Sequence, residues 1–140
     1  MTKGIQDERS LVKLLWENGF AVVRSPASGS STKMPRPDIV AGNSLRNVQF
    51  AIEVKTTHKE TLYISRESIS QLVEFAQRFG CKPVVALRFK SHVRSWIFIQ
   101  PEQLAVTPAS NYKITMREAQ RTGMDFKTLI REGMQTRLTS

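Results

Sequence analysis

The sequence predicts an α/β fold with a central mixed β-sheet flanked by helices. Apolar residues recur at helical spacing in two segments, residues 5–18 and 66–80, and short apolar runs lie between and after these segments. The chain has 140 residues, of which 40% are hydrophobic, so it is long enough for one hydrophobic core and too short for two. No internal repeat or linker divides it, and we expect a single domain over residues 1–140.

The N-terminal part predicts a helix from Ile5 to Asn18, which stops at Gly19 because glycine accepts the left-handed conformation that closes helices. A stretch of small polar residues, prolines and cations further on has the composition of a loop. The elements after this helix are, in order, a strand at Phe20–Val23, a loop at Ser25–Pro37, a strand at Asp38–Ala41 and a turn at Gly42 and Asn43.

The run Val48–Lys55 is the clearest strand in the chain. Apolar side chains occupy every second position, and Gln49, Ala51, Glu53 and Lys55 lie between them. Because side chains alternate between the two faces of a strand, this pattern predicts one apolar face and one largely polar face.

A second helix is expected after Ser65, whose hydroxyl can cap the first free amides, and it ends near Gly80. Its inward residues are Ile69, Leu72, Val73 and Ala76. The remaining elements are strands at Pro83–Arg88 and Ser95–Ile99, a strand at Tyr112–Thr115 and a short helix holding Phe126, Leu129 and Ile130. Up to residue 99 the predicted order is α-β-β-β-α-β-β.

The charge balance favours a polyanionic partner. Lysine and arginine total 21 against 12 aspartates and glutamates, a formal charge of +9. Nucleic acid is the first expectation and an anionic membrane surface the second, while a basic protein without such a partner stays open.

Several protein classes are excluded by simple counts. No apolar run approaches the roughly 20 residues of a membrane-spanning helix, and the N-terminal ten residues lack the apolar core of a signal peptide, so we expect a cytoplasmic protein. The single cysteine, Cys81, excludes an intramolecular disulfide and a cysteine-based zinc cluster, and His58 and His92 are too isolated for a metal finger.

Glu53 and Lys55 lie two residues apart and therefore project from the same face of their strand. If the strands at 38–41 and 48–55 form a hairpin, Asp38 comes close to both. Two carboxylates beside a lysine suit Mg²⁺, which prefers carboxylate oxygens and water, and the Val54 carbonyl is a further candidate ligand. The alternative is an ordinary solvated sheet surface.

Glu8 adds a third acid, because it lies on the apolar stripe of the first helix with Ile5, Leu11 and Val12. A carboxylate in that position is costly unless it is paired or coordinates a ligand. Two interpretations stay open: Glu8 faces the metal, directly or through water, or it forms a helix-edge pair with Arg9.

The loop at residues 25–37 has small residues and hydroxyls that let the backbone approach a phosphate, with Arg24, Lys33 and Arg36 around it. It lacks the spacing of a Walker loop. The alternative is a surface loop without a ligand.

Three blocks in this order, GFAVVRSPASGS (19–30), PRPDIVA (35–41) and IEVK (52–55), resemble the archaeal Holliday junction resolvase family, Hjc. Glu8-Arg9, YISRE (63–67) and QLVEFA (71–76) continue the resemblance, which covers roughly residues 4–99 and leaves 100–140 unassigned.

The resemblance implies a restriction-endonuclease-like fold of the PD-(D/E)xK type and a Mg²⁺-dependent endonuclease, with Mn²⁺ as a substitute. Such an enzyme resolves four-way DNA junctions by paired nicks on opposing strands during recombination and repair. It would act as a homodimer, and recombination or replication proteins are further expected partners.

With this resemblance, the residues take five expected roles. The catalytic set is Glu8, Ser28, Asp38, Glu53 and Lys55, with metal ligands from Glu8, Asp38, Glu53 and the Val54 carbonyl. Contacts to DNA are expected from Arg9, Arg24, Ser30, Lys33, Arg36 and Arg66. Gln71 would support the site from behind these residues, and Phe75 and Phe79 would form the dimer contact, with ordinary core packing as the alternative for the two phenylalanines.

Two other functions stay open. A sequence-specific restriction-type or repair endonuclease could use the same acids and lysine. A DNA-binding module without catalysis could use the charge alone.

Overall fold

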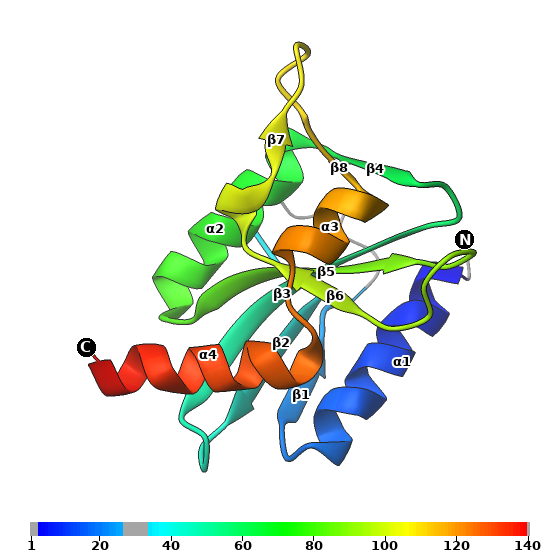
Figure 1. The fold of residues 1–140 in the computed structure, drawn as a ribbon. Coiled ribbons are helices and arrows are strands. Elements are labelled where there is room, and N and C mark those ends of the chain that lie inside the picture. The colour runs from blue at the N-terminus through cyan, green and yellow to red at the C-terminus, as the bar shows by residue number, and fades with distance from the viewer. Residues whose placement is uncertain (1–2, 27–33, 140) are drawn as a thin grey trace.

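A five-stranded sheet forms the centre of the protein (Figure 1). The computed structural model describes the backbone of residues 3–26 and 34–139 and the side chains of residues 5–26 and 34–132. The strands follow the order β1-β2-β3-β5-β6; β3 and β5 are parallel, and the other neighbours are antiparallel. Their bounds are β1 Ala21–Arg24, β2 Ile39–Asn43, β3 Val48–Thr57, β5 Lys82–Phe89 and β6 Ile97–Ile99. The predicted mixed sheet is therefore confirmed.

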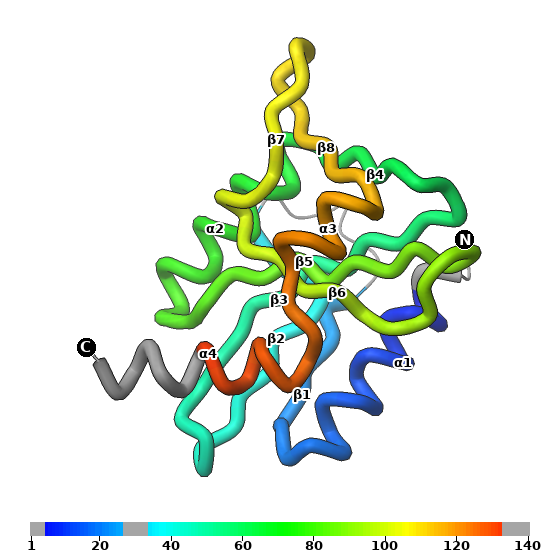
Figure 2. Tube along the Cα trace, viewed as in Figure 1, coloured from blue at the N-terminus to red at the C-terminus, as the bar shows by residue number. Residues whose placement is uncertain are grey.

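Helices cover both faces of this sheet. One face is packed by α1 (Lys3–Glu17) and α4 (Phe126–Thr139), and the other by α2 (Arg66–Phe79) and α3 (Met116–Thr122). A second, three-stranded sheet on the α2 side contains β4 (Thr61–Ile64), β8 (Tyr112–Thr115) and β7 (Ala105–Val106), and a 3₁₀ turn, η1 (Pro101–Gln103), leads into it. The tube in Figure 2 shows the β7–β8 hairpin projecting from the rest of the molecule. None of the described helices is long and apolar enough to cross a membrane.

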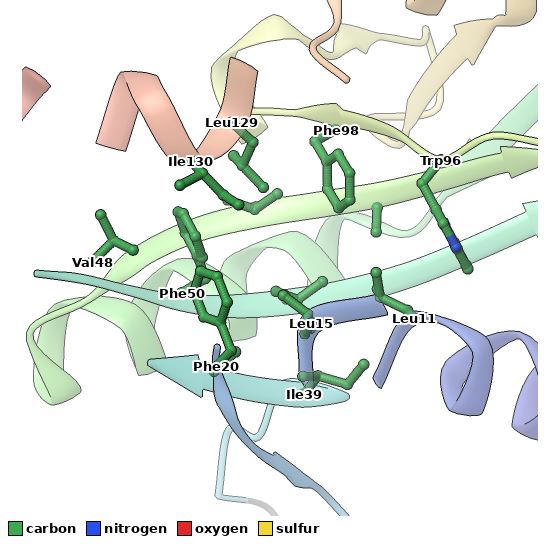
Figure 3. Close-up of a cluster of buried hydrophobic side chains, with 14 residues drawn as sticks. Leu11, Leu15, Phe20, Ile39, Val48, Phe50, Trp96, Phe98, Leu129 and Ile130 are labelled. Atoms are coloured by element: carbon green, nitrogen blue, oxygen red, sulfur yellow. The ribbon is translucent and has the colours of Figure 1, made fainter. Parts of the chain in front are cut away.

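The core on the α1 side fixes the first helix against the sheet (Figure 3). Leu11 and Leu15 of α1 are fully buried in the same cluster as Ile39 of β2 and Phe50 of β3. The rings of Phe20 and Phe50 lie 6.1 Å apart. Because α1 is anchored in this way, its N-terminal turns lie close to the strands that carry Asp38 and Glu53.

The predicted helix signals are confirmed at three positions. Ser65 caps α2, since its side chain accepts a hydrogen bond of 3.1 Å from the Ser68 N–H. Gly80 closes α2 with a φ of 85°, and Gly19, just after α1, has a φ of 90°. A side chain at either glycine would strain the backbone.

Other predictions were wrong in extent or incomplete. β2 continues through Asn43, whose buried side chain accepts from the Arg46 N–H, so the turn follows at residues 44–47. β4 was not predicted, because four residues give too short a pattern, and it is completed by pairing with β8, about fifty residues later. α3 was also not predicted, α4 extends further than the short helix expected, and β6 begins two residues later than predicted.

Candidate active site

The β2–β3 hairpin brings Asp38 to the strand that carries Glu53 and Lys55. Ile39 pairs with Ile52, so Asp38, one residue before β2, lies beside Glu53. The carboxylate of Asp38 accepts a hydrogen bond of 2.8 Å from the Val54 N–H. This bond fixes the Asp38 side chain against β3, and the predicted convergence of these residues is confirmed.

Glu53 and Lys55 form an ion pair on one face of β3. The Lys55 Nζ lies 3.5 Å from a carboxylate oxygen of Glu53, and 13% of the Glu53 side chain is exposed. The side chains of the alternate positions, Ile52 and Val54, belong to the core on the other face. The alternation in the sequence thus separates the polar pair from the α1-side core.

Glu8 approaches the same place from α1. Its carboxylate lies 3.4 Å from the Arg24 Nε at the end of β1. The expected pair with Arg9 is therefore wrong, because the ion-pair partner of Glu8 is Arg24. The other interpretation, in which Glu8 faces a metal directly or through water, stays a prediction.

The three acids influence one another electrostatically. Burial, and after it the Asp38 carboxylate, raise the pKa of Glu53 to about 7, although Lys55 opposes the rise. Burial also raises the pKa of Asp38, against the Val54 N–H and Lys55. For Glu8, burial and then the Asp38 carboxylate raise the pKa, against Arg24. Carboxylates are therefore concentrated at a place where burial penalises their charged form and the local cations offset that penalty only in part.

Such a concentration fits a divalent cation. Mg²⁺ keeps several waters and is held through one or two carboxylates together with substrate phosphates, which matches the Asp38 and Glu53 pair. Among the side chains of residues 5–26 and 34–132, no group of three or more His, Cys, Asp and Glu residues is placed to hold a metal by itself. The third acid, Glu8, is thus close enough to Asp38 for their charges to interact, but it does not complete a set of three direct metal ligands.

A cavity of about 300 Å³ opens beside two of the acids, Glu8 and Asp38. It is lined by both acidic and basic side chains, and the Ser25 hydroxyl at its wall donates to the Pro37 carbonyl. The lining residues are Ile5, Glu8, Arg24, Ser25, Pro26, Arg36, Pro37 and Asp38. Arg24 and Arg36 are thereby placed beside the acids, where an anionic substrate would need them.

The remaining predicted residues are distributed more widely. Arg9 and Arg66 are exposed on α1 and at the start of α2. Gln71 donates to Glu67 one turn earlier on α2, at 3.2 Å, and this bond does not connect it with the acids. Ser28, Ser30 and Lys33 lie outside the described residues.

Phe75 and Phe79 form a stacked pair on α2, with ring centroids 5.4 Å apart. Phe75 packs partly against the core, whereas 55% of Phe79 is exposed. Both line an open pocket of about 530 Å³ together with Met34, Pro35, Glu74 and Arg78. The pair is therefore neither wholly part of the core nor wholly exposed, because the Phe75 ring packs partly against the core and the Phe79 ring is largely exposed.

Sequence reasoning missed one charged cluster next to the acids. Asp7 is buried at 4% exposure and pairs with Lys90 and Arg88. Its position was readable, because Asp7, Leu11 and Leu15 are four residues apart and share one helix face. Its partners were not readable, since they lie more than eighty positions away in the sequence.

The chain is similar to one family over nearly its full length. The family described as "Archaeal holliday junction resolvase (hjc)" matches residues 1–138, so the similarity extends through the tail that the sequence motifs left unassigned. The crossover junction endodeoxyribonuclease Hjc of Archaeoglobus fulgidus is 42% identical over 113 residues, which cover 81% of this chain and 79% of the relative.

Two further relatives and a solved structure agree. The Hjc proteins of Sulfolobus acidocaldarius and Methanocaldococcus jannaschii are 36% and 35% identical, covering 93% and 97% of this chain and 87% and 92% of theirs. The 1.6 Å structure of Archaeoglobus fulgidus Hjc, described as a Holliday junction resolvase, superposes with a TM-score of 0.78 at 36% identity, covering 88% of this chain and 96% of that one. The restriction-endonuclease-like fold expected from the sequence is thereby confirmed.

Proposed function

The chain belongs to the archaeal Holliday junction resolvase (Hjc) family, and from this premise we propose that it is a Mg²⁺-dependent endonuclease that resolves four-way DNA junctions by paired nicks. The observation that carries the proposal is the convergence of Asp38, Glu53 and Lys55 at the β2–β3 hairpin. An acidic pair beside a lysine, next to a cavity lined by both acids and arginines, supports phosphodiester hydrolysis more than binding alone.

The acids would hold the cation. Asp38 and Glu53 are the proposed ligands with the Val54 carbonyl, and Glu8 would act nearby, directly or through water. When bound, the cation supplies positive charge that offsets the charge developing on the phosphate. Mn²⁺ would substitute, because it accepts the same oxygen ligands.

The lysine and arginines would act on the DNA. Lys55 can orient the phosphate and hold a proton at Nζ, next to the group that is attacked. Arg24 and Arg36 line the cavity and would contact the backbone around the cut. Because phosphate contacts carry no base identity, junction choice would come from DNA shape. DNA contacts by the exposed Arg9 and Arg66 and by Ser30 and Lys33 stay predictions of the same kind, and Ser28 stays a predicted catalytic residue.

A homodimer would place two such sites on opposite strands. The stacked Phe75 and Phe79 pair on α2, partly exposed beside an open pocket, supports this contact, because exposed apolar surface can mark a protein–protein interface. The second phenylalanine surface would come from another copy of this chain.

The test compares labelled four-way junctions with matched linear duplexes, with and without Mg²⁺. The proposal expects symmetric nicks in the junction, weak or no cutting of the duplex and no cutting without a divalent cation. Equal cutting of both substrates would refute resolution and leave a general nuclease. Fixed cut positions in plain duplex would indicate the restriction-type or repair endonuclease instead.

Asp38→Ala and Glu53→Ala separate catalysis from binding. A catalyst loses cleavage in both variants and still binds the junction, because removing a carboxylate lessens repulsion of the phosphates. A pure DNA-binding module would have no cleavage to lose, and wild-type inactivity on all DNA substrates would favour it.

A further inference from the structure

Asp7 is a buried carboxylate that the proposed chemistry does not use. It continues the core-facing stripe of Leu11 and Leu15 toward the start of α1, where an apolar residue is usual. Burying a carboxylate is costly unless it is paired and hydrogen-bonded. Ion pairs that offset the cost of burying the Asp7 carboxylate are therefore required at this position.

Two cations from the sheet satisfy this carboxylate. The Lys90 Nζ lies 3.0 Å from one Asp7 oxygen, and an Arg88 nitrogen lies 3.5 Å from the other. Arg88 is itself held in place, because its Nε donates to the Arg94 carbonyl at 2.9 Å and its guanidinium lies 4.8 Å from the centre of the Trp96 ring. The Arg88 side chain therefore has little freedom to move with Asp7.

These cations connect α1 with the strand of the acids. Lys90 follows β5, and its backbone N–H donates to the carbonyl of Thr57, the last residue of β3, at 2.8 Å. Glu53 and Lys55 lie a few residues earlier on β3. Figures 1 and 2 show the N-terminal end of α1 beside the loop that joins β5 to β6.

The next residue, Glu8, is held from the other side. It pairs with Arg24 at the end of β1, while Asp7 pairs with Arg88 and Lys90 at the end of β5. Side chains of consecutive helix residues point in different directions, so the two pairs fix both the position and the rotation of this turn.

We propose that Asp7 is a positioning residue for Glu8: its bonds to Lys90 and Arg88 set where the Glu8 carboxylate lies relative to Asp38. The proposal rests on the nuclease function proposed above. It assigns no contact with DNA or metal to Asp7.

A double-mutant cycle tests this role. Asp7→Asn, Glu8→Gln and the combined variant are compared with wild type in single-turnover junction cleavage with excess Mg²⁺. Misplacing a catalytic group by about 1 Å can cost roughly 100-fold in rate, so Asp7→Asn should slow cleavage by about 10- to 100-fold. In the Glu8→Gln background the same change should have almost no further effect.

Junction affinity separates positioning from binding. Measured in EDTA, the affinity of Asp7→Asn should equal or exceed that of wild type, because the change removes a negative charge and leaves both cations. Hydrogen exchange of the α1 amides should be faster in Asp7→Asn, and this readout needs no catalysis. Lys90→Met leaves Asp7 paired with Arg88 and should therefore give a smaller loss of cleavage rate. This variant replaces Asp7→Asn in the test if Asp7→Asn does not fold.

Asp125→Ala is the matched control. Asp125 accepts from the Thr128 N–H at the start of α4, so this variant loses a helix cap without altering α1. It should be less stable at an unchanged cleavage rate. Equal fractional losses from Asp7→Asn in both backgrounds, or an unchanged rate, would overturn the proposal. A wild-type chain that cuts no junction would instead refute the nuclease function.

Discussion

Neutralising Glu53 should stabilise the metal-free protein, and the gain should grow as the pH rises. Burial and the Asp38 carboxylate raise the pKa of Glu53 from 4.5 to about 7, although Lys55 opposes the rise. Between these two values the folded chain binds a proton that the unfolded chain has released. Since stability falls with pH wherever the folded state binds more protons, Glu53 lowers the free energy of unfolding progressively from about pH 4.5 to pH 7.

The size of the effect follows from the same two pKa values. Each pH unit between them corresponds to about 1.4 kcal/mol, so the full difference is about 3 kcal/mol. Glutamine resembles the protonated side chain and escapes this cost. Glu53→Gln should therefore match wild type below pH 4.5 and be more stable by about 3 kcal/mol at pH 8–9, which is about 10 °C in melting temperature for a chain of this length.

Thermal and urea unfolding in EDTA at several pH values would measure this difference. Excess Mg²⁺ should reverse it, since binding to the folded state stabilises the wild type and Glu53→Gln has lost a ligand. Glu102→Gln, an exposed position on η1, is the control and should show no pH-dependent gain. A Glu53→Gln variant that is less stable than wild type at pH 9, or a gain that is the same at every pH, would refute the reasoning.

Three further outcomes are expected. Lys55→Met should lower junction cleavage by at least about 100-fold, while junction affinity in a gel-shift assay changes little. Phe79→Glu should shift the sedimentation mass from dimer to monomer without loss of fold, whereas Leu45→Glu, at an exposed turn, should not. Gly123→Ala should lower the free energy of unfolding by about 1–3 kcal/mol in urea titration, because the added methyl would collide with the Ile97 side chain; an unchanged midpoint would contradict that close packing.

The sequence was most informative where local signals act alone. Ser65 and Gly80 bound α2 through their own capping and backbone preferences, and the alternation in β3 identified the face of Glu53 and Lys55. The proximity of Asp38 followed from a single assumption, that β2 and β3 form a hairpin. Each of these depends on neighbours within about fifteen residues.

Features that depend on distant partners were not predictable. β4 is stabilised by β8, and no signal in four residues identifies that pairing. Glu8 was expected either to face the metal or to pair with its neighbour Arg9, yet its partner is Arg24, which only the packing of α1 across β1 brings near. Asp7 was overlooked for the same reason, because its cations, on β5 and just after it, lie more than eighty positions away in the sequence.

The Asp38 carboxylate has two roles: it accepts a hydrogen bond from the Val54 backbone N–H of β3, and it forms the acidic pair with Glu53. The pair therefore exists only in a chain whose β2 and β3 have already joined in the correct register, and β3 in turn is flanked by a strand that begins thirty residues later. A nascent chain that has emerged only through Lys55 carries every proposed catalytic residue but lacks the parallel neighbour of β3. We expect it to leave DNA uncut, so that cleavage competence arises only on completion of folding.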